Sequence, residues 1–125
     1  MAIRQDKSKR KPSGGRYKAK SYKRQAQTGK MPTKTTIGEK KTRVERGLGG
    51  NTKIKLLHIN KVNLMDPKTK KASVTDLKTI LESPANRHFV RRSILSKGSI
   101  IETPKGKAKI TNRPSQEGFV NAVLI

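Results

Sequence analysis

The 125-residue chain contains no cysteine and no tryptophan, and its aromatic residues are two tyrosines and two phenylalanines. The absence of cysteine excludes disulfides and thiolate metal sites such as zinc ribbons, and it permits a reducing compartment. No segment approaches the roughly 20 apolar residues that a membrane-spanning helix needs, and residues 1–11 lack the apolar run of a secretory signal. We therefore expect a soluble intracellular protein without a membrane segment, a metal or another cofactor.

The N-terminal third also lacks large apolar side chains. Between Ile3 and Ile37 there is no valine, isoleucine, leucine, phenylalanine or tryptophan, and one acid, Asp6, stands against twelve lysines and arginines. Ordering a residue costs about 1–2 kcal/mol of backbone entropy, and a segment that buries almost no apolar surface cannot offset that cost. We expect this segment to be disordered in the free protein and to be ordered by a polyanion.

Positive charge is abundant throughout. The chain holds 31 lysines and arginines against 8 aspartates and glutamates, with a net charge of +23, of which +13 falls in residues 1–47 and +10 in residues 48–125. A small domain needs a far smaller net charge than this to be soluble. Basic chains bind nucleic acids because they neutralise closely spaced phosphates and release condensed counterions. The charge therefore indicates a nucleic-acid partner rather than a merely soluble surface.

The composition divides the chain at the glycine cluster Gly47-Leu48-Gly49-Gly50. Before it, turn-forming residues at 11–15 and 28–32 punctuate a polar, basic segment, so we predict an extended basic tail over residues 1–47. After it, short apolar runs alternate with turn residues. Residues 48–125 are therefore predicted to form one small domain, whose core is limited by its length.

Short apolar runs predict strands in this domain, at 53–59, 89–95, 99–103, 107–111 and 119–125. Turn and loop residues separate them, at 66–70, 83–86, 97–99, 104–106 and 113–118. Residues 72–81 suit either a helix or a strand, and their β-branched residues favour the strand. The fold predicted is all-β: a small barrel-like or sandwich domain of short strands with a long extended basic N-terminal tail.

Two basic runs in the tail, Lys7–Lys11 and Tyr17–Arg24, carry the residue types that bind RNA. Basic side chains neutralise phosphates, and aromatic rings stack on unpaired bases for about 1–3 kcal/mol each. The alternative is a solvated tail in which Tyr17 and Tyr22 are incidental. At this density of charge, the nucleic-acid interpretation is favoured.

Glycines and arginines elsewhere are weaker candidates. Residues 13–16 and 47–51 have glycines that let the backbone approach a phosphate, but such patterns more often mark turns or hinges. The second is no dinucleotide fingerprint, because Thr52 stands where G-x-G-x-x-G requires its last glycine. On a strand, Arg91 and Arg92 would point to opposite faces, so only some of the arginines near Phe89 could share one surface.

The chain offers little for catalysis. His58 and His88 stand apart, without a cysteine, an H-E-x-x-H or a G-x-S-x-G motif. The acids of the domain are scattered over separate elements, at Asp66, Asp76, Glu82, Glu102 and Glu117. We therefore expect neither an enzyme nor a small-molecule substrate.

Several short motifs occur in a specific order along the chain, at 11–16 (KPSGGR), 36–39 (TIGE), 49–51 (GGN), 86–94 (NRHFVRRSI), 97–103 (KGSIIET) and 106–114 (GKAKITNRP). Each is weak alone, but together they cover nearly the whole chain. In this respect the chain resembles the S8e family of small-ribosomal-subunit proteins, in its short archaeal form.

The resemblance implies a small β-barrel-like domain with a basic extension, bound to small-subunit ribosomal RNA and without catalytic activity. We accordingly expect a structural constituent of the cytoplasmic ribosome that supports translation, beside neighbouring ribosomal proteins. The residues expected to bind RNA are Lys7, Lys9, Arg10, Lys11, Ser13, Gly14, Gly15, Arg16, Tyr17, Lys18, Lys20, Tyr22, Lys23, Arg24, Lys30, Lys34, Lys40, Lys41, Arg43, Arg46, Gly49, Gly50, Asn51, Arg91, Arg92, Lys97 and Arg113.

Two rival functions share the same charge. A DNA-compacting chromatin protein would bind duplex DNA as well as structured RNA, and competition at matched salt separates the two. A small RNA-acting enzyme or translation factor would cycle on and off the ribosome and would be absent from washed small subunits.

Overall fold

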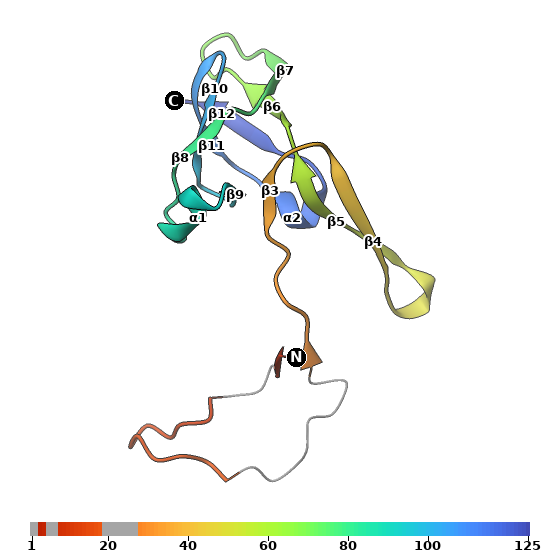
Figure 1. Cartoon of the computed structure of the whole chain (residues 1–125), viewed down its shortest axis with the longest axis vertical. Coiled ribbons are helices and arrows are strands. Elements are labelled where there is room, and N and C mark those ends of the chain that lie inside the picture. Colours follow the sequence, from red (N-terminus) through yellow and green to blue (C-terminus); the bar gives the residue numbers. More distant parts are fainter. Residues whose placement is uncertain (1–2, 5–7, 19–27) are drawn as a thin grey trace. The chain divides into compact units, whose positions relative to one another are not determined.

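The computed structural model describes residues 3–4, 8–18 and 28–125 (Figure 1). The chain divides into two compact units, Met1–Pro32 and Thr33–Ile125. In the first unit, β1 (Ile3–Arg4) pairs antiparallel with β2 (Thr28–Gly29), so one short ladder joins the two ends of this unit. Residues 8–18 form a separate tight turn within it.

The second unit contains two sheets. The four-stranded sheet has the order β4-β5-β3-β9, with β3 at Thr35–Ile37, β4 at Lys41–Arg46, β5 at Thr52–Ile59 and β9 at Ile94–Leu95. The six-stranded sheet has the order β7-β6-β12-β11-β10-β8, with β6 at Lys61–Met65, β7 at Ala72–Asp76, β8 at Thr79–Glu82, β10 at Ile100–Thr103, β11 at Gly106–Ile110 and β12 at Asn121–Leu124. The helical turns are short: η2 at Leu48–Gly50, α1 at His88–Arg91 and α2 at Pro114–Glu117. The predicted all-β class is confirmed.

The core lies between the two sheets, and the alternation of buried and exposed residues along each strand determines which side chains enter it. In β6, Val62 and Leu64 are buried while their neighbours are exposed, and in β11 the buried Ala108 and Ile110 alternate with exposed lysines. Side chains of successive strand residues point to opposite faces, so each strand supplies one apolar row. The core residues are Leu56, Ile59, Val62, Leu64, Leu77, Ile80, Leu95, Ile101, Ala108, Ile110, Val120 and Ala122.

The second unit begins earlier than the sequence predicts. Residues 33–47, predicted to be tail, belong to it because β3 pairs parallel with β5 and β4 pairs antiparallel with β5. Thr35 is fully buried, and its Oγ1 donates a hydrogen bond of 2.8 Å to the Leu56 carbonyl. Backbone pairing and a hydrogen-bonded threonine need no large apolar side chain, so composition carries no signal for strands β3 and β4.

The ambiguous segment 72–81 is extended, as its β-branched residues indicated. It forms β7 and the start of β8, and the intervening Leu77 is buried. The predicted turn at 66–70 is also confirmed, with the Asp66 amide donating to the Lys71 carbonyl at 3.0 Å. The turn at 104–106 connects β10 to β11 as a hairpin.

The strand predicted from Phe89 to Leu95 is wrong in its first half, where the structure has α1. Asn86 initiates this helical turn: its Oδ1 accepts the His88 N–H at 2.9 Å, and its carbonyl accepts the Phe89 N–H at 3.0 Å. Such local side-chain hydrogen bonds offer the backbone an alternative to a sheet ladder. Strand β9 therefore begins only at Ile94.

Residues 113–118, predicted to be a loop, contain α2. The Glu117 side chain folds back onto the start of this helix: its Oε1 accepts a hydrogen bond from the Arg113 N–H at 3.1 Å, and its Oε2 accepts one from Asn112 Nδ2 at 3.0 Å. Gly118 ends the turn with a φ of 82°, a left-handed conformation that glycine adopts without strain. The hydrogen bond from the Arg113 N–H, followed by that from Asn112, lowers the pKa of Glu117 from its ordinary value of 4.5.

The core account predicts unequal costs for two leucine truncations. Leu56 is fully buried and Leu48 is 97% exposed. Leu56→Ala should lower the free energy of unfolding by about 2–5 kcal/mol, because it removes buried area and leaves a cavity. Leu48→Ala should change it by less than about 0.5 kcal/mol. Denaturant titration measures both, and equal losses would contradict this placement of the core.

The Glu117 contacts predict a pH dependence. Because the folded-state pKa is lowered, the stabilisation is complete above 4.5 and is lost as the pH falls through the folded-state value. Carboxyl NMR titration should therefore show Glu117 protonating below 4.5, and Asn112→Ala should move that pKa upward by removing one donor. A pKa of 4.5 or above in the unsubstituted protein would contradict the hydrogen bonds to this carboxylate.

Candidate nucleic-acid interface

The turn at 8–18 is the most cationic feature of the first unit that the structure describes. The Lys11 N–H donates to the Gly15 carbonyl at 2.8 Å, and the Gly14 N–H donates to the Lys11 carbonyl at 3.0 Å. A single antiparallel bridge joins Arg10 to Arg16. Gly14 has a φ of 84°, which glycine adopts readily, so the KPSGGR motif encodes this chain reversal.

Side chains of this turn are all exposed and include no acid between residues 8 and 18. Its cations are Lys9, Arg10, Lys11, Arg16 and Lys18. The Lys11 Nζ lies 5.6 Å from the centroid of the Tyr17 ring, so one aromatic face is already held beside positive charge. The turn thus presents cations and an aromatic ring on a hydrogen-bonded backbone.

A second cationic surface is the ribbon formed by β4 and β5, which Figure 1 shows reaching out to the turn around η2. On one face Arg43 lies directly opposite Lys55, and Glu45 lies opposite Lys53. Directly opposite residues share a face of the sheet, and like charges there are destabilising. The Arg43 Nε lies 3.7 Å from Glu45 Oε1, so the acid on this face pairs with a cation of its own strand.

The end of this ribbon is a glycine turn, as the pattern at 47–51 indicated. Gly49 and Gly50 have φ values of 69° and 78°, and Asn51 Nδ2 donates to the Leu48 carbonyl at 3.0 Å. Leu48 is 97% exposed at the end of the ribbon. The backbone here is open to a partner, and the predicted residues Gly49, Gly50 and Asn51 all lie in this turn.

A third group of cations surrounds α1. Arg91 ends the helical turn and Arg92 follows it, and both are exposed. Because residues 88–91 are helical, the argument that Arg91 and Arg92 must occupy opposite faces of a strand does not apply. The Lys34 Nζ lies 5.9 Å from the centroid of the Phe89 ring, so a cation from the residue before β3 lies against α1.

Every predicted lysine and arginine that the structure describes is exposed to solvent. They occupy the turn at 8–18, β4, the neighbourhood of α1 and isolated loop positions such as Lys97 and Arg113. Both compact units therefore carry predicted residues. Five of the predicted residues lie outside the described residues: Lys7, Lys20, Tyr22, Lys23 and Arg24.

The sequence prediction missed cations that strand pairing brings into the ribbon. Lys53 and Lys55 stand opposite Glu45 and Arg43, and neither is among the residues that the sequence predicts to bind RNA. Their alternation with Ile54 was visible in the sequence. The missing signal was the identity of the partner strand, because β4 had been assigned to the tail.

Chemistry other than anion binding finds little support in the described part of the chain. His58 Nδ1 lies 2.6 Å from Thr36 Oγ1, across the β3–β5 pairing. Among the described residues, no three histidine, cysteine, aspartate or glutamate side chains come together as a metal site would require. None of the helices described there has the length and apolar character needed to cross a membrane.

A model of the family described as ribosomal protein S8e matches residues 4–125. The chain belongs to the ribosomal protein S8e family. The match spans both the basic N-terminal unit and the β domain, so the resemblance seen in the motifs is confirmed. This S8e chain is accordingly a ribosomal protein of the small subunit, of the archaeal type.

Curated relatives agree along the whole S8e chain. Small ribosomal subunit protein eS8 of Methanobrevibacter smithii is 48% identical over 125 residues, with all of both chains covered. The eS8 of Methanococcus aeolicus is 44% identical over 126 residues, covering all of this chain and 98% of the relative. The eS8 of Picrophilus torridus is 40% identical over 125 residues, again with both chains fully covered.

The charged face of the ribbon predicts opposite effects for two neighbouring lysines. Lys55→Thr removes a like charge opposite Arg43 and should raise the free energy of unfolding by about 0.2–1 kcal/mol. Lys53→Thr removes the opposite charge that faces Glu45 across the strands and should lower the free energy of unfolding by a similar amount. Both effects should shrink as salt is added. Denaturant titrations at low and high salt measure this, and a same-sign change in the two variants would contradict the register.

Proposed function

We propose that this S8e-family protein binds and stabilises folded small-subunit ribosomal RNA through its basic N-terminal segment and the basic surface of its β domain. One observation carries the proposal: the chain reversal at 8–18 presents five exposed cations and no acid. Such a group has no carboxylate within its own turn to neutralise it, and RNA phosphates fill that role.

The two units have different tasks in this proposal. The β domain has its own core and provides a rigid body, while the N-terminal segment follows the phosphate backbone into the folded RNA. Lysine and arginine contacts to phosphate position a protein without reading sequence. Tyr17, held beside Lys11, is placed to stack on an unpaired base.

Partners and location follow from membership of the family. We propose ribosomal RNA as the principal partner, with neighbouring ribosomal proteins beside it, in the cytoplasmic ribosome. No small-molecule substrate, cofactor or catalytic residue has a role in this function. The protein supports translation by holding RNA structure.

The test compares two triple substitutions that remove the same charge. The first variant changes Arg10, Arg16 and Lys18 to glutamine. It should weaken binding to small-subunit ribosomal RNA and reduce the slope of log K against log salt by about 2 to 3. Lys68, Lys71 and Lys78, exposed residues outside the predicted interface, provide the matched control. Fluorescence anisotropy at several salt concentrations measures both.

Two outcomes would contradict the proposal. The first is an equal loss of slope in both triple variants, which would mean that charge acts only in bulk. The second is equally tight binding of the unsubstituted protein to duplex DNA at matched salt, which would favour a DNA-compacting role. The expected result is a larger effect at the turn and a preference for the folded RNA.

A further inference from the structure

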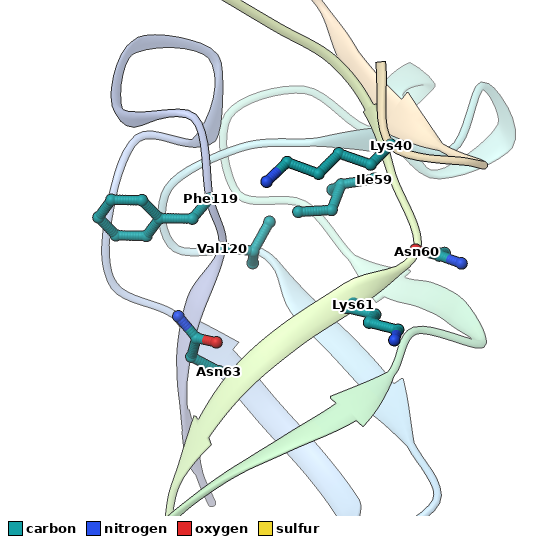
Figure 2. Close-up of a pocket in the computed structure, with 7 residues that line it drawn as sticks. All are labelled: Lys40, Ile59, Asn60, Lys61, Asn63, Phe119 and Val120. Carbon is teal, nitrogen blue, oxygen red and sulfur yellow. The ribbon is translucent and has the colours of Figure 1, made fainter. Parts of the chain in front are cut away.

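A hollow of about 330 Å³ lies where β5 passes into β6, against the segment that leads into β12 (Figure 2). Its lining comes from three stretches of chain that are distant in sequence, with Lys40, Ile59, Asn60, Lys61, Asn63, Phe119 and Val120. Ile59 and Val120 are buried core residues, with 5% and 1% of their surface exposed, and they form an apolar floor. The volume is at the small end of the range for ligand sites in proteins.

Phe119 forms one wall of the hollow, and 42% of its surface is exposed. Figure 2 shows its ring on the opposite side of Val120 from Asn60 and Lys61, with the Lys40 side chain extending past Ile59 toward it. Phe119 is one of two phenylalanines in the chain, and it lies at the surface beside the hollow. Its exposed face is available for a planar ligand.

Hydrogen bonds hold the backbone around Phe119 in place. Asn112 Nδ2 donates to the Phe119 carbonyl at 2.9 Å, and Asn112 Oδ1 accepts the Asn121 N–H at 3.0 Å. On the other side, the Asn63 N–H donates to the Val120 carbonyl at 2.9 Å. These contacts involve no part of the phenylalanine ring, so the ring can be changed without removing them.

Polar groups at the rim suit a nucleotide. Asn63 Nδ2 donates to Asn121 Oδ1 at 3.0 Å, so its own Oδ1 can still accept a hydrogen bond. Lys40 and Lys61 are exposed, and the lining includes no acid. An apolar floor, an aromatic wall, an amide and two ammonium groups together match a base with its phosphates better than they match an apolar peptide.

We propose that this hollow binds one unstacked nucleotide of the small-subunit ribosomal RNA. The base stacks on Phe119 over the floor of Ile59 and Val120, Asn63 hydrogen-bonds the edge of the base, and Lys40 and Lys61 contact the flanking phosphates. The inference rests on the proposed function, and it adds a base-binding site in the β domain to the phosphate contacts of the N-terminal segment.

The first experiment measures affinity for small-subunit ribosomal RNA. Phe119→Ala should weaken binding by about 5- to 150-fold, the range that loss of one base–aromatic stack produces. The slope of log K against log salt should be the same as in the unsubstituted protein, because no phosphate contact is lost. Leu81→Ala is the matched control: Leu81 is 37% exposed and lies on β8, at the other end of the six-stranded sheet from β6. Equal affinity of the Phe119 and Leu81 variants overturns the inference.

The second experiment uses the absence of tryptophan. Phe119→Trp and Leu81→Trp each give a protein with a single tryptophan. A uridylate oligonucleotide should quench the emission of the Phe119→Trp protein more than an abasic oligonucleotide of equal length and charge, because only bases can stack. The Leu81→Trp protein should respond equally to both. Equal quenching of the Phe119→Trp protein by the two oligonucleotides overturns the inference. A protein segment would then be the expected occupant of the hollow.

Failure of this inference is distinguishable from failure of the proposed function. If the unsubstituted protein binds the ribosomal RNA but Phe119→Ala binds it equally well, the base site alone is wrong. If the unsubstituted protein does not bind that RNA, the proposed function and this site are both wrong. The expected result is tight, salt-dependent binding that the Phe119 substitution weakens at every salt concentration.

Discussion

Unmatched positive charge is the constraint on which the rest of this protein depends. With 31 lysines and arginines against 8 aspartates and glutamates, even complete one-to-one pairing within the chain would leave 23 cations without a partner. Where the structure describes these cations, none is buried, and some lie side by side, as with Arg43 opposite Lys55. Like charges at close range destabilise the free protein, so the partner that neutralises them also completes its stability.

The β domain can carry this much charge because its core needs few large apolar residues. Its core consists of one apolar face from each sheet. Polar residues also hold the fold together: Thr35 Oγ1 donates to the Leu56 carbonyl, and Asn112 Nδ2 donates to Glu117 and to the Phe119 carbonyl before β12. A small interior of this kind leaves most of the surface free for charge. Every residue of that core belongs to the second unit, and the described part of the N-terminal unit presents cations.

Strand alternation made much of the fold predictable from sequence. The rows of β10 and β11, the turns at 66–70 and 104–106, and the KPSGGR reversal all follow from local patterns. Other features depended on contacts that no local pattern contains. Composition predicted a tail where the structure has β3 and β4, because a buried threonine and a backbone ladder carry no apolar signal. Phe89 and Val90 are helical rather than extended, because Asn86 accepts hydrogen bonds from the backbone that follows it. For the interface, exposure of the predicted cations followed from their charge, whereas the ribbon lysines and the hollow beside Phe119 required the tertiary fold.

The central claim is that ribosomal RNA, rather than an interior of its own, holds the cationic N-terminal turn. Hydrogen exchange at the amides of Lys11, Gly14 and Tyr17, with and without small-subunit ribosomal RNA, tests it most directly. The account predicts fast exchange in the free protein and strong protection on adding RNA, while core amides such as that of Ile101 are protected in both states. Turn amides as protected as the core amides in the absence of RNA would contradict it.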